Sequence, residues 1–133
     1  MNRLFGEAFD DRENYAAHPP DDAYAQAQLA RPDTVLLVAE AGGETIGALA
    51  GYILPKFEQA RSELYLYDLA VAESWRRRGV AMALIDETRR IARAAGVWVI
   101  YVQADTLPED EPAIALYDQL GTREEVLHFD IAP

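Results

Sequence analysis

Three consecutive arginines, Arg76, Arg77 and Arg78, stand directly before Gly79 in a chain with only 12 basic residues. An apolar stripe with helical spacing follows the glycine, so a helix is predicted to begin there. The first N–H groups of a helix have no partner inside it, and the helix dipole adds partial positive charge at that end. Arginines beside this charge are unfavourable unless an anion binds. The spacing therefore predicts a cradle for a diphosphate.

The arginine loop stands between a predicted strand and a predicted helix. The strand covers 64–71, where aromatic and branched residues dominate. The loop is not a Walker A loop, because no G-K-[ST] follows it, and the G-x-G-x-x-G of a dinucleotide site is absent. The alternative interpretation is a solvated, arginine-rich helix start in which Gly79 only turns the chain.

Asp68 is a carboxylate inside the apolar strand, flanked by Tyr67 and Leu69. A charge in such surroundings must be satisfied by hydrogen bonds or serve a function. Asp68 is therefore a candidate base, and the alternative is a buried carboxylate that accepts backbone hydrogen bonds.

The remaining elements are predicted from periodicity and from turn residues. A mixed α/β layer structure is expected, with an antiparallel front half and a parallel pair formed by a right-handed crossover. Asp21 or Asp22 is expected to cap the second helix, Gly42-Gly43 to form a hairpin turn, and Gly47 and Gly51 to mark a bulge or a close approach. The predicted helices cover about 1–9, 22–30, 80–95 and 111–120, and the predicted strands cover 34–40, 44–54, 64–71, 97–103 and 125–131.

Length and composition limit the classes of function. At 133 residues the chain is expected to form one domain, 1–133, and the net charge of −11 argues against nucleic acid as a partner. Cysteine is absent and the two histidines are far apart, so a metal site is not expected. No apolar run reaches 18 residues, so no membrane span is expected and a cytoplasmic protein is the default interpretation.

Two motifs resemble those of the GCN5-related N-acetyltransferases. The first is Arg76-x-x-Gly79-x-Ala81, which is similar to the Q/R-x-x-G-x-G/A signature that holds the pyrophosphate of acetyl-coenzyme A. The second is AIALYDQLG from Ala113, which resembles the family's downstream segment, with Asp110 where the family usually has Asn. The segments YILPKFEQARSELYLYDLAV, VIYVQAD and EEVLHFDI look like the type I aminoglycoside 3-N-acetyltransferases, over about 4–131.

The resemblance implies a fold and an activity. The expected fold is the GNAT fold: a mixed, mostly antiparallel sheet with a splayed parallel pair, flanked by helices. The strand that normally precedes the first helix of the family is expected to be missing here. The implied activity is direct transfer of acetyl from acetyl-CoA, in a ternary complex, to the 3-amino group of a gentamicin-like antibiotic, which confers resistance. The resemblance leaves a homodimer open.

The resemblance also implies roles for individual residues. Tyr117 is expected to protonate the departing thiolate, and its alternative is a core tyrosine. Asp68 is the expected base, because the matching strand of similar polyamine acetyltransferases carries acids that face the acceptor. Asp110 is also a predicted N-cap of the helix that follows it. The expected cofactor-binding residues are Leu69, Val71, Arg76, Arg77, Arg78, Gly79, Val80, Ala81, Asp110 and Ala113. The expected residues for a cationic amine acceptor are Tyr65, Tyr67, Asp105, Asp110, Glu111 and Asp130.

Three alternatives to the antibiotic remain open. An acetyltransferase for polyamines or another small amine would require the same acidic groove. An acetyltransferase for protein lysines or N-termini would need an open peptide groove. A coenzyme A-binding module without catalysis, such as a sensor, would need neither the tyrosine nor the acidic side.

Overall fold

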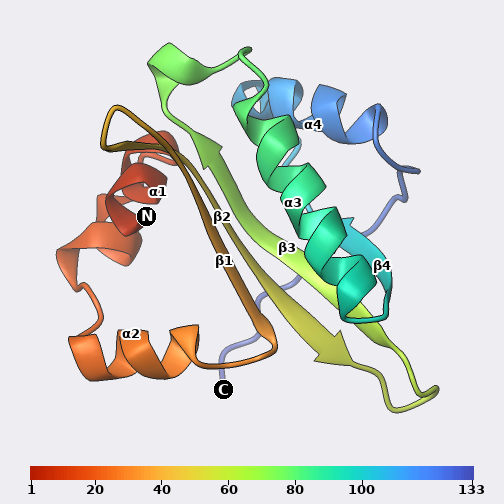
Figure 1. Cartoon of the computed structure of the whole chain (residues 1–133). Helices are drawn as coiled ribbons and strands as arrows, with labels where there is room; N and C mark the ends of the chain where they lie inside the picture. The colour runs from red at the N-terminus through yellow and green to blue at the C-terminus, as the bar shows by residue number, and fades with distance from the viewer. The chain divides into compact units, whose positions relative to one another are not determined.

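The computed structural model describes all residues from Met1 to Pro133 (Figure 1). It contains two compact units, Met1–Val102 and Gln103–Pro133, which are described separately below. The first unit is a sheet with helices on both faces, and the second contains one short helix and an irregular tail. The arginine loop and Asp68 belong to the first unit, and Tyr117 belongs to the second.

The four strands of the first unit form one mixed sheet in the order β1-β2-β3-β4. Antiparallel pairing joins β1 (Thr34–Ala41), β2 (Glu44–Pro55) and β3 (Ser62–Val71), and β4 (Val97–Val102) runs parallel to β3. The turn between β1 and β2 contains Gly42 at φ 60° and Gly43 at φ 83°, the left-handed geometry that a two-residue hairpin requires. The predicted mixed sheet and its parallel pair are confirmed.

A β-bulge interrupts the pairing of β2 with β3. Ala50 pairs with Asp68 but Gly51 pairs with Leu66, so Tyr67 is the extra residue of the bulge. A Cβ on Gly51 would lie 3.0 Å from the backbone oxygen of Tyr65, so a side chain there would require the backbone of β3 to shift. The bulge confirms the expectation for Gly51, and such an irregularity changes where neighbouring side chains point.

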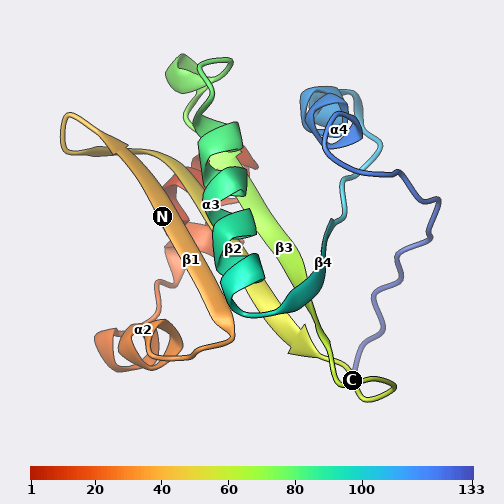
Figure 2. The same ribbon diagram turned by 45° about the vertical axis from the view of Figure 1, so that its right-hand side comes forward.

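Helix α3 (Val80–Ala94) covers one face of the sheet, and Figure 2 shows it in front of the strands. Its apolar stripe buries Leu84 and Ile85, and the hydroxyl of the buried Thr88 donates a hydrogen bond of 2.9 Å to the Leu84 carbonyl. The helix ends before Gly96, whose φ is 67°. None of the helices combines the length and the apolar character needed to cross a membrane.

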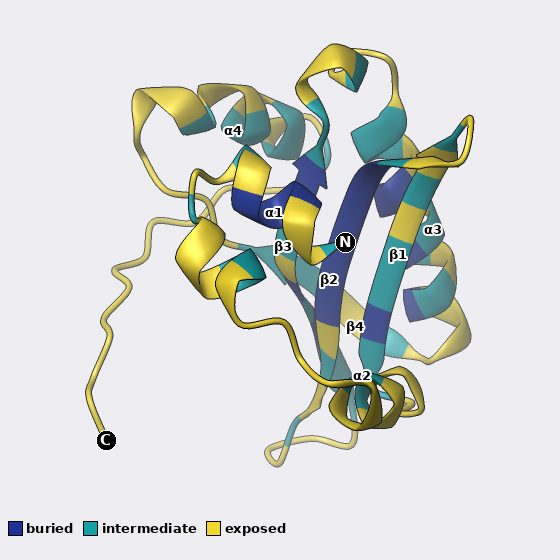
Figure 3. Ribbon diagram, turned by 90° about the vertical axis from the view of Figure 1, so that its left-hand side faces the viewer, coloured by how far each residue is buried: buried dark blue, intermediate teal, exposed yellow.

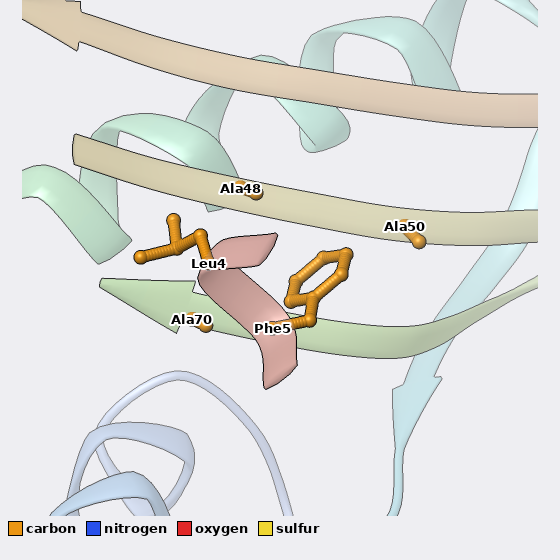
Figure 4. Packing of buried hydrophobic residues seen from close by; sticks show 5 residues of the cluster. All are labelled: Leu4, Phe5, Ala48, Ala50 and Ala70. Carbon is orange, nitrogen blue, oxygen red and sulfur yellow. The ribbon is translucent and has the colours of Figure 1, made fainter. Parts of the chain in front are cut away.

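Helix α1 (Asn2–Ala8) covers the opposite face of the sheet. Leu4 and Phe5 pack against Ala48, Ala50 and Ala70, whose small side chains let the helix approach the strands closely (Figure 4). Figure 3 shows the middle of β2 buried between the helices, over residues 46–51. The first unit therefore has three layers, with β2 and β3 at its centre.

The segment between α1 and β1 differs in part from the prediction. A π-helical turn, η1 (Glu13–Ala17), forms where only irregular chain was expected, because the helix-breaking prolines begin two residues later. Helix α2 (Asp22–Leu29) follows, and the side chain of Asp21 accepts a 2.7 Å hydrogen bond from the Tyr24 N–H. The predicted cap at Asp21 is confirmed.

The second unit contains a 3₁₀ turn, η3 (Pro108–Asp110), and helix α4 (Glu111–Asp118). No helix or strand follows α4, so the strand predicted over 125–131 is wrong. An alternating pattern forms a strand only where a neighbour pairs with its backbone, and here none does. The tail is exposed, as the yellow ribbon of Figure 3 shows. Its exposed large apolar residues are Val126, Leu127, Phe129 and Ile131.

Candidate active site

The arginine loop connects the end of β3 to the start of α3. A short 3₁₀ turn, η2 (Glu73–Trp75), leads into it. Arg77 has a φ of 62° and Gly79 a φ of 81°, so the backbone turns through the left-handed region twice before the helix begins. This geometry costs a non-glycine residue about 1–2 kcal/mol, so the position of Arg77 is a strained one.

The start of α3 has the features of an anion site. The first helical hydrogen bond runs from Ala83 N–H to the Gly79 carbonyl at 2.9 Å, so the N–H groups of Val80, Ala81 and Met82 precede the helical ladder. Gly47 of β2 lies beneath this turn: a Cβ there would be only 2.6 Å from Val80 Cγ1. The close approach expected at Gly47 therefore anchors the start of the helix.

The three loop arginines are exposed, and no salt bridge of the structure involves them. Arg76 Nε donates a 3.3 Å hydrogen bond to the Val71 carbonyl, and the Arg78 guanidinium lies 5.1 Å from the centre of the Trp75 ring. Unpaired cations beside free helical N–H groups are what a diphosphate would require.

The end of β3 has a free edge. β4 pairs with β3 only from Ser62 to Leu66, so the last five residues of β3 extend beyond it. The Ala72 N–H donates a 2.9 Å hydrogen bond to the Ile46 carbonyl of β2. In an antiparallel pair every second residue bonds to the neighbouring strand, so the N–H and C=O groups of Leu69 and Val71 point away from β2. Beyond Leu66, β3 thus has no β4 neighbour, and Leu69 and Val71 keep backbone N–H groups that the sheet does not use.

Cavities of the first unit differ in their distance from the predicted site. One of about 200 Å³ opens between α1 and the end of β3, and another, of about 170 Å³, lies at the opposite end of α3. The first adjoins the free edge and Arg76, and the second adjoins none of the predicted site residues. The first is lined by Leu4, Glu7, Ala8, Val71, Ala72, Glu73 and Arg76.

Asp68 is half-buried on the face of the sheet that α1 covers. Its Oδ1 accepts a 2.7 Å hydrogen bond from the hydroxyl of Tyr15 in η1. Burial raises the pKa of Asp68 above its ordinary value, and the hydrogen bond from Tyr15 opposes that rise. The partner of the carboxylate is thus a side chain from a distant segment, not the backbone groups that the alternative interpretation required. A carboxylate with a raised pKa is suited to taking a proton near neutral pH.

Four tyrosines on three strands, which we call the tyrosine cluster, are joined by ring contacts beside Asp68. Their ring centres are 4.8 Å apart for Tyr65 and Tyr101, 5.3 Å for Tyr65 and Tyr67, and 5.9 Å for Tyr52 and Tyr67. Tyr52 is 38% exposed and Tyr67 57% exposed. Burial, and to a lesser extent the charge of Asp68, raises the pKa of both Tyr52 and Tyr65. The cluster therefore presents accessible ring surface close to the carboxylate.

Sequence analysis found two members of this site beside Asp68, namely Tyr65 and Tyr67, and missed three tyrosines. Tyr52 and Tyr101 are the direct cross-strand partners of Tyr65, so the register of the sheet would have revealed them. No local signal pointed to Tyr15, which is 53 positions from Asp68 in the sequence.

Tyr117 lies in α4 of the second unit. Burial, together with the charge of Asp110, raises the pKa of Tyr117 to about 12. Its hydroxyl is therefore protonated throughout the neutral range and can act as a proton donor. The pKa of Asp110 is itself raised by burial and by the nearby charges of Asp105 and Glu109.

The predicted side-chain cap at Asp110 is wrong. Asp110 precedes α4, but its side chain makes no capping hydrogen bond. Its φ of −90° and ψ of −9° are helical, because η3 runs directly into α4, whereas a capping residue needs an extended backbone. The Asp110 carboxylate is thus not engaged by the helix.

The other predicted residues of the second unit are spread over three segments. Asp105 is exposed in the loop before η3, and the exposed Glu111 and half-buried Ala113 lie in the first turn of α4. Asp130 lies on the irregular tail, 3.4 Å from His128. Asp105 is thus near Asp110, and Asp130 is paired within the tail. The structure contains no group of three or more His, Cys, Asp or Glu side chains that could hold a metal ion.

Comparisons with known proteins identify the family. The Acetyltransferase (GNAT) family matches residues 1–122. An aminoglycoside acetyltransferase from an uncultured soil metagenomic sample is 54% identical, with a TM-score of 0.98 over 100% of this chain and 88% of that chain.

A second aminoglycoside acetyltransferase from an uncultured soil metagenomic sample, solved in complex with sisomicin, is 28% identical, with a TM-score of 0.87 over 98% of this chain and 84% of that one. An aminoglycoside N-acetyltransferase in complex with CoA is 25% identical, with a TM-score of 0.73 over 99% of this chain and 91% of that one. A search of curated proteins found no match. The chain therefore belongs to the GNAT family of acetyltransferases.

Proposed function

We propose that the protein, as a single N-acetyltransferase domain, transfers acetyl from acetyl-CoA to the 3-amino group of a gentamicin-like aminoglycoside and so confers antibiotic resistance. The observation that carries the proposal is a half-buried carboxylate, Asp68, beside exposed tyrosine rings and next to a free strand edge. The 54% identity to an aminoglycoside acetyltransferase supports the class of acceptor.

The first unit has the features needed to hold acetyl-CoA. Arg76, Arg77 and Arg78 neutralise the pyrophosphate, and the N–H groups at Gly79, Val80 and Ala81 donate to its oxygens. The backbones of Leu69 and Val71 pair with the pantetheine arm along the free edge of β3. Asp110 and Ala113 at the start of α4 are proposed to complete the cofactor contacts. Bound acetyl-CoA supplies the acetyl group as a thioester.

Asp68 and Tyr117 each carry one proton transfer of the proposed reaction. Asp68 accepts a proton from the acceptor's ammonium group, which leaves a neutral amine with a free electron pair. That nitrogen bonds to the thioester carbon, the carbon–sulfur bond breaks, and Tyr117 gives its hydroxyl proton to the departing sulfur. The nitrogen then releases its second proton to water, and Tyr117 regains a proton from water. The products are the amide and free coenzyme A, and positioning with charge stabilisation supplies most of the acceleration.

The acceptor is a small molecule with several ammonium groups on sugar-like rings. The exposed rings of Tyr65 and Tyr67 attract ammonium groups over their faces and pack against apolar ring surface. Asp105, Asp110, Glu111 and Asp130 are proposed to add negative charge for the remaining ammonium groups. The net charge of −11 also favours the arrival of a cation.

A thiol-release assay tests the proposal, with acetyl-CoA, gentamicin and spermidine as the reactants in parallel. We expect fast turnover with gentamicin and slow or no turnover with spermidine. Turnover with spermidine alone would instead identify a polyamine acetyltransferase. Binding of acetyl-CoA without turnover of either amine would favour a coenzyme A-binding module.

A further inference from the structure

Tyr15 reaches Asp68 from a segment that sequence analysis left without a role. Its hydroxyl donates a 2.7 Å hydrogen bond to Asp68 Oδ1, and this bond joins η1 to β3 across 53 positions of the chain. Oδ1 is therefore occupied by a protein donor. Neither Tyr15 nor Asp68 takes part in a salt bridge.

The ring of Tyr15 is held independently of its hydroxyl. Its centre lies 5.7 Å from that of Phe5 and 5.5 Å from that of Phe9, and Tyr15 packs against the core beneath α1. Aromatic contacts of this kind contribute beyond simple burial of area. The packing fixes where the hydroxyl lies, so Tyr15→Phe removes the hydrogen bond while it keeps the ring in place.

We propose that Tyr15 is a positioning residue for Asp68: its hydroxyl holds Oδ1 and so leaves Oδ2 to accept the proton of the acceptor. This inference rests on the proposed role of Asp68 as the base. Tyr15 acts through Asp68 and need not contact the acceptor. A base whose orientation is fixed before the acceptor binds needs less reorganisation during proton transfer.

The titratable groups around Asp68 determine how strongly the pKa of its carboxyl depends on Tyr15. Titratable neighbours reach it from every element on that face: Tyr15 from η1, Tyr52 from β2 and Tyr65 from β3, with Tyr101 of β4 stacked on Tyr65.

The charged side chains of α1 and η1 are engaged elsewhere. Arg3 and Glu7 of α1 lie 3.9 Å apart, and Glu13 of η1 lies 3.4 Å from His18. Tyr67 and Asp11 also act on Tyr15. Tyr15 is thus the neighbour whose hydrogen bond stabilises the charged form of Asp68.

The expected direction of the effect follows from this hydrogen bond. Burial and the charge of Asp68 raise the pKa of Tyr15 above its ordinary value, so the hydroxyl donates at every pH at which the enzyme works. The hydrogen bond lowers the pKa of Asp68 against the effect of burial. When the hydroxyl is removed, the pKa of Asp68 rises and more of the carboxyl is protonated at a given pH.

The test is the pH profile of kcat/KM for the wild type and for Tyr15→Phe. The acid limb of the profile should move about one pH unit upward, which is about a tenfold loss on that limb and a smaller loss above it. KM for acetyl-CoA should not change. Tyr24→Phe makes the same chemical change on an exposed ring of α2 and should leave the profile where it is. An unshifted acid limb in Tyr15→Phe would overturn the inference.

Two further measurements separate this inference from the proposed function and from a folding defect. In an Asp68→Asn background, Tyr15→Phe should cause no further loss of kcat, because both changes act on one group. In the unmodified protein, the ¹³Cζ resonance of Tyr15 should titrate with Asp68, and this titration should vanish in Asp68→Asn. A Tyr15 resonance insensitive to Asp68 would overturn the inference. A wild type that acetylates no amine would overturn the proposed function, and the titration would still decide whether Tyr15 holds the carboxylate.

Discussion

Asp68, the base of the proposed mechanism, reduces the stability of the fold at neutral pH. Folding half-buries the carboxyl and raises its pKa, so the folded protein favours the protonated form. The protonated Asp68 therefore contributes to the stability of the fold. This contribution is fully present below the pKa that Asp68 has in the unfolded chain, and it is lost as the pH rises through the higher pKa that Asp68 has in the folded protein. At neutral pH the ionised Asp68 therefore disfavours the fold, which is common for active-site groups.

Asp68→Asn should accordingly separate activity from stability. The amide keeps the shape and an acceptor for the Tyr15 hydroxyl but has no charge, so Tm at pH 7 should stay equal or rise. Without the base, kcat/KM should fall about 10²–10⁴-fold. Thermal unfolding and steady-state kinetics measure both quantities. Asp86→Asn on the exposed surface of α3 is the matched control. A variant that loses stability but keeps activity would contradict the role of Asp68.

Tyr117→Phe should impair turnover while acetyl-CoA still binds. The pKa of Tyr117 is raised to about 12, so the hydroxyl keeps its proton at neutral pH, and in the proposed mechanism it gives that proton to the departing sulfur. Its loss should lower kcat about 10²–10⁴-fold, and calorimetry should find a similar Kd for acetyl-CoA. Ionisation of Tyr117 should not limit the wild type below about pH 11. Unchanged kcat in Tyr117→Phe would exclude it as the acid.

Single residues differ in how far the sequence identifies them. Asp68 and Tyr117 stand out because a charge interrupts an apolar strand and a motif fixes the tyrosine. Tyr15 has neither signal, since its importance arises from a hydrogen bond across 53 positions. Asp110 stands directly before α4, where an Asp usually caps a helix, yet the preceding 3₁₀ turn gives it a helical backbone that prevents capping.

Among the elements, β2 and α3 depend on Gly47. In Gly47→Ala the new Cβ would lie 2.6 Å from Val80 Cγ1 and 3.1 Å from Leu84 Cδ1. Val80 has little rotamer freedom in a helix, so the helix start must move. We expect a loss of about 1–3 kcal/mol in the free energy of unfolding, with a raised KM for acetyl-CoA. Denaturant unfolding and kinetics would measure the two effects.

A second substitution checks this cause. Val80→Ala removes the methyl group that the new Cβ would meet. The double variant, Gly47→Ala with Val80→Ala, should therefore lose less stability than the sum of the losses in the two single variants. Strictly additive losses would show that the close approach at Gly47 is not the reason for the glycine.

The elements were predictable where local chemistry and tertiary structure agree. The hairpin at Gly42-Gly43 and the cap at Asp21 follow from local geometry, and helix α3 follows from its apolar stripe. The segment 125–131 alternates like a strand but has no pairing partner in the structure, so its pattern alone could not decide its conformation.

For the whole molecule, the excess of 23 acidic over 12 basic residues affects how fast a charged substrate arrives more than it affects the fold. Three of the basic residues are consecutive in the arginine loop, so the rest of the chain is more acidic still. An acceptor with several positive charges should be attracted, and salt should screen that attraction.

This attraction gives a prediction for ionic strength. Between low salt and 0.5 M salt, with a Debye length falling from about 10 Å or more to a few Å, KM for gentamicin should rise several-fold. Sucrose at matched viscosity, which carries no charge, should have little effect. A KM that does not respond to salt would mean that contacts within the site, and not the acidic surface, draw the acceptor in.

The position of the acetyl group on the product tests the central claim most directly. Purified product from gentamicin and acetyl-CoA would be analysed by two-dimensional NMR, which locates the new amide on the ring system. We predict acetylation of the 3-amino group alone. An acetyl group on any other amine would contradict the proposed specificity, and an absence of product would contradict the proposed reaction.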